Sequence, residues 1–440
     1  MRTTPAFDAH DPPARELLDD CVHCGFCLPA CPTYQLWGQE ADSPRGRILL
    51  MDAAVRGELP LSGDLVRHWD ACLGCMACVT ACPSGVRYDR LIEQTRQQVE
   101  RRHRRAPLDR ARRAALFAVF PHPRRMRLLA VLLLLYRTSG LRRLLRAWRP
   151  AGGPATLAPA VSAGAVTARL PRHVPAAATP PLQRVVLLTG CVQQGLFGDV
   201  NQATARVLSA YGCEVAIPGG QGCCGALELH GGRQAAAQRR AARLLDVLGD
   251  DPDTLVAVNS AGCGSVLKDY GTLLGTSRAA ALGARVRDVS EILAELGAPA
   301  APGRLAALPL RVAYHDACHL AHAQGIREQP RRVLAEVPGL QLVPLAEADV
   351  CCGSAGIYNL VQPKAAADLG RRKAGHVRAV RPDALVAANP GCLLQVSAHL
   401  AGAGAVPTFH PVELIDASLR GVPATTLLAA RRRLQGLAPA

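Results

Sequence analysis

Two runs of closely spaced cysteines constrain this chain more than any other feature. The first run is CVHCGFCLPACP at residues 21–32, and the second is CLGCMACVTACP at residues 72–83. In each run three cysteines lie at intervals of three positions, and a fourth comes four positions later, directly before a proline. Three thiolates on one tight loop can bind a single compact metal centre. The spacing therefore predicts two metal sites within one small folded unit.

The spacing C-x2-C-x2-C-x3-C-P is that of bacterial two-cluster ferredoxins, in which the fourth cysteine of each run binds the cluster of the other run. We therefore expect two 4Fe–4S clusters, the first bound by Cys21, Cys24, Cys27 and Cys82 and the second by Cys72, Cys75, Cys78 and Cys31. The cysteine before each proline is expected at the start of a helix. Gly25, Gly74 and Ala77 keep the loops small, so that backbone N–H groups can approach the sulfides. Two zinc sites are the alternative, but zinc gains nothing from the third step of the spacing or from a crossed ligand.

The 17 cysteines in 440 residues also bear on the compartment. The first residues, MRTTPAFDAH, lack the apolar stretch of a secretory signal, so we expect a reducing cytoplasm in which thiols bind metals instead of forming disulfides. The longest apolar run, residues 128–136, is shorter than the roughly 18 residues that cross a membrane. We expect a cytoplasmic protein, with peripheral attachment to the inner face of the cell membrane as an open alternative.

Residues 1–100 are expected to form an all-helical, ferredoxin-like domain around the two clusters. Between the cysteine runs, residues 47–56 carry apolar side chains at helical spacing, and Pro60 and Gly63 should interrupt that helix. A compact bacterial ferredoxin would have a shorter, strand-rich connection. The sequence thus predicts that a helical linker separates the two halves of the cluster-binding domain.

Positive charge is concentrated in one segment. The net charge is +16, and residues 101–149 contain fifteen arginines with Asp109 as their single acid. Four interpretations stay open: a basic amphipathic helix on an anionic membrane, a surface for a partner subunit, a nucleic-acid-binding segment, or a helical linker with a solvated arginine face. Nucleic acid is not expected, because no recognised motif accompanies the charge. Residues 150–181, rich in Pro, Ala and Gly, predict a flexible linker, so 101–181 would join two folded parts.

The C-terminal half contains an internal repeat. The apolar stretches at residues 184–192 and 311–319 correspond, and each is followed by a CCG triplet and then by one more cysteine. In both copies, short apolar stretches alternate with helical ones, which predicts two α/β modules with largely parallel sheets at residues 182–300 and 308–435. Corresponding cysteines are 127, 128, 128 and 129 residues apart. They are Cys191, Cys223, Cys224 and Cys263 in the first module and Cys318, Cys351, Cys352 and Cys392 in the second.

Each matched cysteine follows the end of a predicted strand, where open α/β sheets bind their ligands. The four thiols of each module should therefore lie close together, and Gly225 lets the backbone turn after the adjacent Cys223 and Cys224. One interpretation is an additional metal site in each module, and the other is a set of packing cysteines. Packing does not require thiols at matched positions, which favours the first interpretation.

Three other features carry less weight. The G-x-G-x-x-G match at residues 220–225 lacks its glycines in the second module, so the CCG triplet explains it better than a dinucleotide site. His315 and His319 mimic a zinc-protease pair but lack the long helix and the glutamate. They are expected to be satisfied loop histidines, or else to tune a neighbouring cofactor. Cys213 has no counterpart and is expected to be structural.

The stretches CVHCGFCLPACPTYQLWGQEADSPRGRILL, ACLGCMACVTACPSGVRYDRLIE, GCCGALELH and VCCGSAGIYNL resemble the iron–sulfur subunits of glycolate oxidases, also called glycolate dehydrogenases. The resemblance covers nearly the whole chain and is weakest at residues 105–180. More broadly, the chain is similar to the paired CCG-domain family, which includes subunits of lactate-utilisation enzymes, anaerobic glycerol-3-phosphate dehydrogenase and heterodisulfide reductase. The expected fold class is α + α/β, with a helical two-cluster ferredoxin-like domain followed by two CCG modules.

The resemblance implies a subunit that takes electrons from a FAD-containing flavoprotein partner, which oxidises glycolate to glyoxylate. The subunit would relay them through two 4Fe–4S clusters to an acceptor such as quinone. The sequence shows no convincing flavin or nicotinamide loop and no acid–base set for a hydroxy acid, so we assign no catalytic residue and expect no activity from the chain alone.

Other family activities stay open as alternatives. They are an iron–sulfur subunit of a related lactate or glycerol-3-phosphate dehydrogenase, and a heterodisulfide or thiol reductase that acts at the CCG sites. In heterodisulfide reductases each CCG module ends in C-x-x-C, whereas Ser260 and Asn389 replace the first cysteine of that pair here. This departure argues against disulfide reduction and leaves open whether the CCG modules bind a further cluster.

Overall fold

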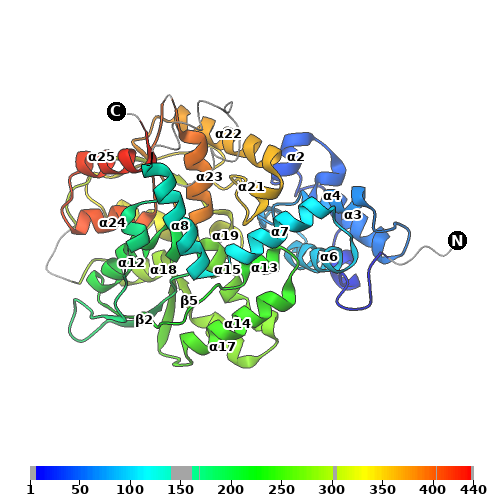
Figure 1. Ribbon diagram of the computed structural model, residues 1–440, viewed down its shortest axis with the longest axis horizontal. Coiled ribbons are helices and arrows are strands. Elements are labelled where there is room, and N and C mark those ends of the chain that lie inside the picture. Colours follow the sequence, from blue (N-terminus) through cyan, green and yellow to red (C-terminus); the bar gives the residue numbers. More distant parts are fainter. Residues whose placement is uncertain (1–5, 140–160, 168, 301–304, 403, 438–440) are drawn as a thin grey trace.

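The computed structural model describes residues 6–139, 161–167, 169–300, 305–402 and 404–437. It confirms the expected α + α/β fold class. In Figure 1 the blue N-terminal helices lie on the right, and the green and yellow-to-red modules lie on the left.

The N-terminal part is helical in all of its described elements. They are α1 (Arg15–Asp19), α2 (Pro32–Trp37), the 3-10 helix η1 (Glu40–Asp42), α3 (Pro44–Val55), α4 (Gly63–Asp70), α5 (Ala77–Thr80) and α6 (Tyr88–Arg102). The helix predicted at residues 47–56 is α3, which begins earlier because Ser43 caps it by accepting a hydrogen bond from the Gly46 N–H. Gly63 does not interrupt a helix as expected; it begins α4, and Ser62 caps that helix.

Large side chains from three helices fill the core of the N-terminal part. Met51 of α3, Trp69 of α4, and Leu91 and Ile92 of α6 are all fully buried. Several cysteines of the two runs pack against the same core. The helices therefore anchor both cysteine loops.

The segment that follows is helical at first and then joins the first sheet. Its elements are α7 (Pro107–Val119), α8 (Pro123–Thr138), α10 (Ala163–Thr167) and β1 (His173–Val174). Residues 140–160 of the expected basic segment and linker lie outside the described residues. The flexible linker predicted up to residue 181 is wrong for its described part. Val161 and Val166 pack with Met126 of α8, and β1 pairs antiparallel with the next strand of the sheet.

The first α/β module is built on a five-stranded sheet of order β1-β3-β2-β4-β5. All of its strands except β1 run parallel. The strands are β2 (Gln183–Leu187), β3 (Cys213–Ala216), β4 (Thr254–Val258) and β5 (Val286–Asp288). The helices are α11 (Val192–Leu196), α12 (Gly198–Ala210), α13 (Ala226–His230), α14 (Gln234–Leu248), α15 (Ala261–Lys268), α16 (Tyr270–Leu274), α17 (Ser277–Arg285) and α18 (Val289–Leu296).

The second module repeats this plan with a four-stranded, wholly parallel sheet of order β7-β6-β8-β9. The strands are β6 (Arg311–His315), β7 (Gln341–Val343), β8 (Ala384–Ala387) and β9 (Thr408–Phe409). The helices are α19 (Cys318–Ala321), α20 (Glu328–Ala335), α21 (Tyr358–Val361), α22 (Pro363–Ala379), α23 (Pro390–Leu400), α24 (Pro411–Leu419) and α25 (Ala424–Gln435).

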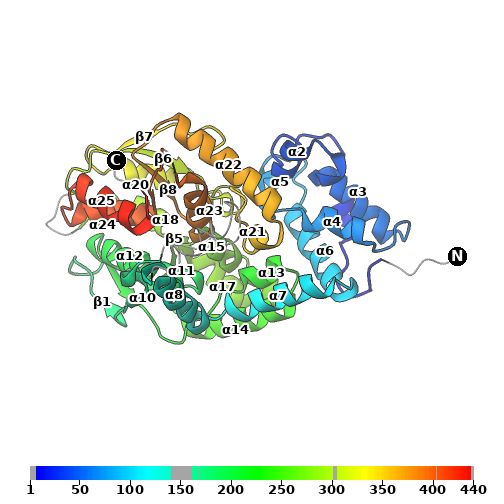
Figure 2. The same ribbon diagram turned by 45° about the horizontal axis from the view of Figure 1, so that its top comes forward.

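One apolar core lies between the two modules. Leu187 of the first sheet shares it with Tyr314 and Phe409 of the second, and α12 packs against α24 while α18 packs against α20. The N-terminal helices contact both modules, α2 through α22 and α6 through α13 (Figure 2). The three parts therefore meet around the ends of the sheets where the cysteines lie. Among the described helices, none is both long enough and apolar enough to span a membrane.

Candidate functional site

Three cysteines of the first run and two of the second, Cys78 and Cys82, line a common cavity of about 30 Å3. Cys21, Cys24 and Cys27 lie on the loop before α2, and Cys82 lies between α5 and α6. Gly25 turns the loop with a φ of +89°. The structure thus brings together the set expected for the first cluster, and their role as ligands remains a prediction.

A second cavity, of about 20 Å3, is lined by the other set, Cys31, Cys72, Cys75 and Cys78. Cys31 directly precedes α2, and Pro32 is the first residue of that helix, as expected. The same expectation is wrong for Cys82, which precedes a turn: its carbonyl accepts the Gly85 N–H, and α6 begins only at Tyr88.

Polar hydrogens point at sulfur in the second cavity. The Gly74 N–H donates to Cys72 Sγ at 3.3 Å, and the Tyr88 hydroxyl donates to the same sulfur at 3.5 Å. Hydrogen bonds of this kind stabilise thiolate and sulfide charge and tune the reduction potential of a bound cluster.

The thiols of the second cavity differ in their tendency to ionise. Burial raises the pKa of Cys75, helped by the nearby Cys318, and burial also raises the pKa of Cys78. Burial acts the same way on Cys72, but the Arg47 and Arg96 guanidiniums outweigh it and hold the pKa of that thiol below its usual value. Thiols that burial keeps protonated become thiolates beside a cationic metal centre. The donor set therefore fits a thiolate-bound iron–sulfur cluster.

Arg47 is a buried side chain of the second cavity that the cysteine spacing does not reveal. Its side chain is 1% exposed and lines the second cavity. Its Nε donates to the His68 carbonyl at 2.7 Å, its Nη2 donates to Thr33 Oγ1 at 3.1 Å, and Nη2 lies 3.5 Å from an Asp42 carboxylate oxygen. The one available signal was an arginine at an inward-facing position of the apolar pattern in α3.

The four matched cysteines of the first CCG module form a continuous series. Cys191 follows β2, Cys223 and Cys224 lie on the loop before α13, and Cys263 lies in the first turn of α15. Along the series Cys191, Cys223, Cys224 and Cys263, each thiol lies close enough to the next to shift its pKa. Gly225 has a φ of +90° and donates its N–H to Cys223 Sγ at 3.4 Å, so the glycine turns the backbone as expected.

In the second module Cys318, Cys351, Cys352 and Cys392 form an equivalent series, in which each thiol lies next to the following one. Cys318 Sγ lies 3.9 Å from Cys351 Sγ, and both pack in one apolar cluster with Cys75 of the N-terminal part. Cys352 and Cys392 pack in the core of the module and contact each other. The expected meeting of four thiols is thus present, but its two halves face different surroundings.

All eight matched cysteines line a central cavity of about 430 Å3, together with Cys72, His230 and His319. His319 is satisfied, as expected of a loop histidine: its Nδ1 lies 2.9 Å from Ser265 Oγ, and its Nε2 lies 3.0 Å from the Gly74 carbonyl. Burial lowers the pKa of His319 to about 3, so the ring is neutral. The imidazole therefore bridges the second ferredoxin-type loop and the CCG modules.

Two further side chains hold this loop against the modules. The Tyr358 hydroxyl donates to the Ala71 carbonyl at 3.1 Å. Arg96 donates to the Cys72 carbonyl at 2.5 Å and to the His230 carbonyl at 3.1 Å. Neither Tyr358 nor Arg96 could be assigned from sequence, because their partners lie more than 20 residues away or in another domain.

The structure also bears on the glycine motif, on Cys213 and on His315. The G-x-G-x-x-G match lies on the CCG loop, where the Gln221 side chain binds the Thr189 backbone N–H. Cys213 is fully buried in the shared core and burial raises its pKa to about 12, which agrees with a structural role. His315 is not a fully satisfied loop histidine: its Nδ1 lies 2.8 Å from the Ala348 carbonyl, but its buried Nε2 has no hydrogen-bond partner among the described residues.

Comparisons with known protein families match most of the chain. Residues 17–86 match the 4Fe-4S dicluster domain, and residues 185–268 and 312–397 each match the cysteine-rich domain called CCG. Residues 108–150 match the linker region of the glycolate oxidase iron-sulfur subunit. The cysteine runs and the repeat therefore belong to recognised iron–sulfur and cysteine-rich domains.

Two individual relatives align with more than nine-tenths of this chain. The "Probable glycolate oxidase iron-sulfur subunit" of Bacillus subtilis is 36% identical, over 91% of this chain and 93% of that protein. The "Glycolate oxidase iron-sulfur subunit" of Escherichia coli is 35% identical, over 92% of this chain and 95% of that protein. Lactate utilization protein A of Geobacillus kaustophilus is 28% identical over only 53% of this chain. The chain belongs to the family of glycolate oxidase iron–sulfur subunits.

Proposed function

We propose that this chain is the electron-transfer subunit of a flavin-dependent glycolate dehydrogenase that converts glycolate to glyoxylate. The observation that carries the proposal is the contact between its metal-site cysteines. Cys75 of the second ferredoxin-type set shares a buried apolar cluster with Cys318 and Cys351 of the second CCG module. Metal-binding cysteines therefore follow one another from the outer loop of the N-terminal part to the central cavity.

The eight ferredoxin-type cysteines act as ligands in two crossed sets. When bound, 4Fe–4S clusters supply one-electron carriers. Cys82 joins the first loop and Cys31 joins the second, so each loop depends on the other for its fourth thiolate. Leu73 and Tyr358 exclude water between the second loop and the CCG modules. In a medium of low polarity, the N–H group of Gly74 and the guanidinium of Arg47 stabilise negative charge on the sulfurs most effectively.

The thiols of the first CCG module are the candidate for a further iron–sulfur cluster. They offer four sulfur donors on the wall of the central cavity, each lying next to the following one in the series. Soft thiolate sets of this kind select iron–sulfur clusters or zinc.

The glycolate-oxidising chemistry belongs to a partner subunit that carries FAD. The substrate and the partner are inferred from family membership, and quinone is the proposed electron acceptor. The chain is therefore active only within the complex.

We further propose that the complex is cytoplasmic and attaches to the inner face of the cell membrane through α8. The outer face of this helix carries three leucines that are 54% to 60% exposed, Leu128, Leu132 and Leu135. The first turns of α8 add three exposed arginines, Arg124, Arg125 and Arg127. Exposed leucines beside arginines are typical of helices that lie on anionic lipid surfaces.

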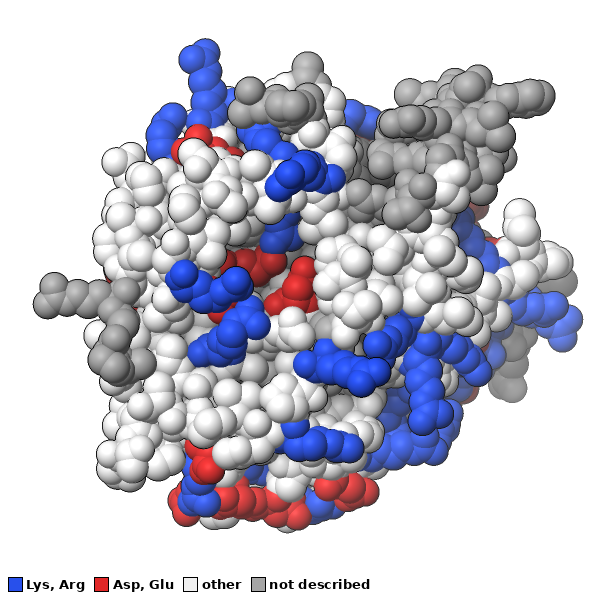
Figure 3. Space-filling view, turned by 60° about the vertical axis from the view of Figure 1, so that its left-hand side comes forward, with Lys and Arg blue, Asp and Glu red and all other residues white. Residues whose placement is uncertain are grey.

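Part of the arginine excess has a structural role instead. Arg105 and Arg113 both bind the carboxylates of Asp70 and Asp109. On the face in Figure 3, Lys and Arg side chains gather most broadly at the lower right, and acidic side chains lie in the centre and along the lower edge.

The function is tested by reconstituting the chain with its flavoprotein partner and measuring glycolate-dependent reduction of a quinone analogue. We expect activity from the complex and none from the isolated chain. In the Cys75→Ser variant, glycolate should still reduce the flavin, while quinone reduction falls at least tenfold. Cys213→Ala, which removes a buried core thiol that lines none of these three cavities, serves as the control. Glycolate turnover by the isolated chain, or full quinone reduction by Cys75→Ser, would contradict the proposal.

The membrane contact is tested with vesicles that contain an anionic lipid. The double variant Leu128→Gln, Leu132→Gln should bind these vesicles at least tenfold more weakly, because each leucine contributes about 1.5 kcal/mol or more when buried. Leu108→Gln, at an 82% exposed position on α7, is the matched control. Unchanged vesicle binding together with weakened binding to the flavoprotein would make α8 a subunit interface instead.

A further inference from the structure

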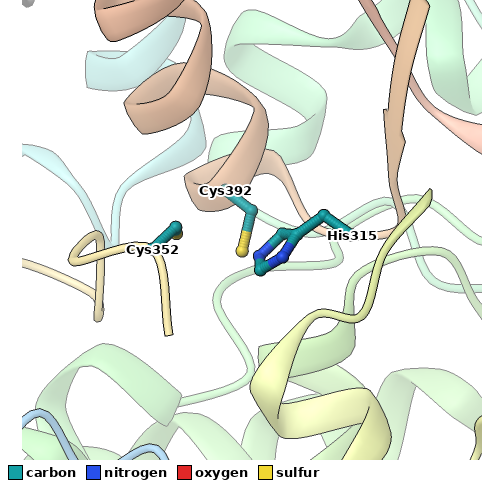
Figure 4. A group of neighbouring side chains, drawn as sticks. All are labelled: His315, Cys352 and Cys392. Carbon is teal, nitrogen blue, oxygen red and sulfur yellow. The ribbon is translucent and has the colours of Figure 1, made fainter. Parts of the chain in front are cut away.

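The second CCG module contains a set of donor groups that the first module lacks. His315, at the end of β6, occupies the position that Leu188 occupies in the first module, 127 residues earlier. The ligand atoms of His315, Cys352 and Cys392 all lie within 4.8 Å of one another, and all three residues are buried. Figure 4 shows the imidazole and the two cysteine side chains converging from three different elements.

The hydrogen bonding of His315 leaves one ring nitrogen available as a ligand. Its Nδ1 lies 2.8 Å from the carbonyl of Ala348, which can only accept, so Nδ1 carries the proton. Its Nε2 therefore presents a lone pair beside the Cys352 thiol, and among the described residues no hydrogen bond of normal geometry reaches this buried atom. Burying an unpartnered polar atom costs about 1–3 kcal/mol. A metal ion would satisfy Nε2, and a backbone carbonyl that orients the other nitrogen is typical of metal-binding histidines.

A second layer of contacts fixes that carbonyl. The Lys373 ammonium is 2% exposed and lies 3.4 Å from the Ala348 carbonyl while it donates to the Glu347 carbonyl. The loop that orients His315 is thus held from both sides. The positive charge of Lys373 also lies near Cys351, Cys352 and Cys392, and it favours their thiolate forms.

The division of the thiols in this module separates two potential sites. Cys318 and Cys351 face the N-terminal part and pack against Cys75. Cys352 and Cys392 pack with the core of the module, on the side of His315. The first module shows a similar arrangement, because Cys224 and Cys263 pack with the core of that module. The two modules differ in the histidine, since His315 has no counterpart in the first module, where Leu188 stands at its position.

We propose that His315, Cys352 and Cys392 bind one mononuclear divalent ion of the zinc class. Zinc accepts imidazole and thiolate ligands together, and two thiolates balance its charge. Cys352 and Cys392 also line the central cavity, so a fourth ligand reaches the ion from that side. The site is separate from the two ferredoxin-type sets and does not depend on which hydroxy acid the complex oxidises.

The test measures zinc, iron and acid-labile sulfide in the full-length protein purified without oxygen. We expect about one zinc per chain in addition to the iron. His315→Leu introduces the side chain that the first module has at this position, and it should remove at least nine-tenths of the zinc while iron and sulfide stay unchanged. Cys392→Ser should act in the same direction, and Cys263→Ser, its counterpart in the first module, should keep the zinc.

Cobalt provides a readout that does not depend on activity. After zinc is exchanged for Co2+, the wild-type protein should show thiolate-to-cobalt charge-transfer absorption, and His315→Leu should lose it while keeping its iron–sulfur spectrum. The proposal fails if the wild-type protein binds neither zinc nor added Co2+, or if His315→Leu retains zinc. It also fails if His315→Leu loses iron in place of zinc, which would make the histidine part of an iron–sulfur site.

Discussion

At the scale of residues, one buried ion pair should contribute strongly to the stability of the N-terminal part. Arg47 and Asp42 are each 1% exposed and lie 3.5 Å apart beside the second ferredoxin-type cavity. Burial opposes the charge of Arg47, but the acidic groups around it, Tyr88, Cys72, Cys31 and Asp42, outweigh burial and raise the pKa of the guanidinium, which stays charged. Removing one member of a buried ion pair leaves an uncompensated charge in a medium of low polarity.

We expect Arg47→Met to destabilise the N-terminal part by about 3–5 kcal/mol. The urea concentration at which the visible absorbance of the clusters is half lost should fall accordingly. Arg56→Met is the matched control, because Arg56 ends the same helix with a 47% exposed side chain whose ion pairs contribute about 1 kcal/mol at most. Equal urea midpoints for the two variants would show that the buried ion pair stabilises the protein no more than the exposed ion pairs of Arg56 do.

A second prediction at this scale concerns Asp288, which caps α18 and is 2% exposed. Burial raises its pKa from 3.8 to about 6, although hydrogen bonds from Ser290 oppose the shift and Glu291, Lys268 and Tyr314 surround the group. Because the folded form binds the proton more tightly than the unfolded form, the stabilising effect is complete below about pH 4 and is lost as the pH rises through 6. The full difference is about 3 kcal/mol.

Asp288→Asn keeps a helix cap and removes the titration. Between pH 5 and 7.5 the wild-type protein should lose more thermal stability than this variant does. The quantity to compare is the change in Tm of each protein between the two pH values, since histidines elsewhere titrate in both. If both proteins lose the same stability, Asp288 has an ordinary pKa in the folded state.

At the scale of elements, the connection from a strand to the next helix decides where the thiols lie. Both CCG triplets end in a glycine with a φ near +90°, Gly225 and Gly353. A Cβ on Gly225 would lie 3.0 Å from the Ala237 carbonyl oxygen of α14, and a Cβ on Gly353 would lie 2.8 Å from the Ala366 carbonyl oxygen of α22. The glycine therefore allows the thiol loop to lie directly on the following helix.

Gly225→Ala should destabilise the first module by about 1–3 kcal/mol, through the left-handed backbone and the contact with α14. Gly220→Ala is the control on the same loop, because Gly220 has a φ of +80° but open space where a Cβ would stand. Thermal unfolding should show a clearly lower Tm for Gly225→Ala than for Gly220→Ala. Equal Tm values would mean that the left-handed backbone alone explains the loss of stability, without a contribution from the contact with α14.

At the scale of the whole molecule, the two ferredoxin-type cavities lie at different depths. The second is lined by residues of the N-terminal part, and its loop residues Leu73 and Cys75 pack against the second CCG module. The loop of the first instead carries Val22 and Phe26, with exposed fractions of 68% and 67%. Cys24, on the same loop, is also exposed. An exposed apolar rim at one end of the series of metal sites is suited to docking of the flavoprotein partner.

The double variant Val22→Gln, Phe26→Gln should weaken binding of the flavoprotein at least tenfold while iron content stays unchanged. The expected loss follows from the apolar area that both side chains would bury. Leu49→Gln, 46% exposed on α3, controls for a general change of surface polarity. Surface plasmon resonance with immobilised flavoprotein measures the effect, and unaltered binding would place the partner elsewhere.

The spacing of cysteines and apolar residues along the chain was sufficient to predict much of the fold. The eight ferredoxin-type cysteines, the helical N-terminal part and the two parallel-sheet modules were all expected from sequence, because ligand spacing and apolar periodicity are properties of short stretches. The prediction failed where a distant contact changes the outcome. Val161 and Val166 order part of the predicted linker only because α8 lies beside them, and Pro83 starts no helix although Pro32 does.

Only the tertiary structure decided which thiols lie next to each other and which groups surround them. The repeat predicted two equivalent sets of cysteines, but the approach of the N-terminal part to the second module places Cys75 beside Cys318 and Cys351. The lone pair of His315 likewise becomes significant only when Cys352 and Cys392, more than 35 residues away, lie against it. Sequence shows which groups can bind a metal, and folding decides which of them meet, because charge and burial depend on neighbours that are distant along the chain.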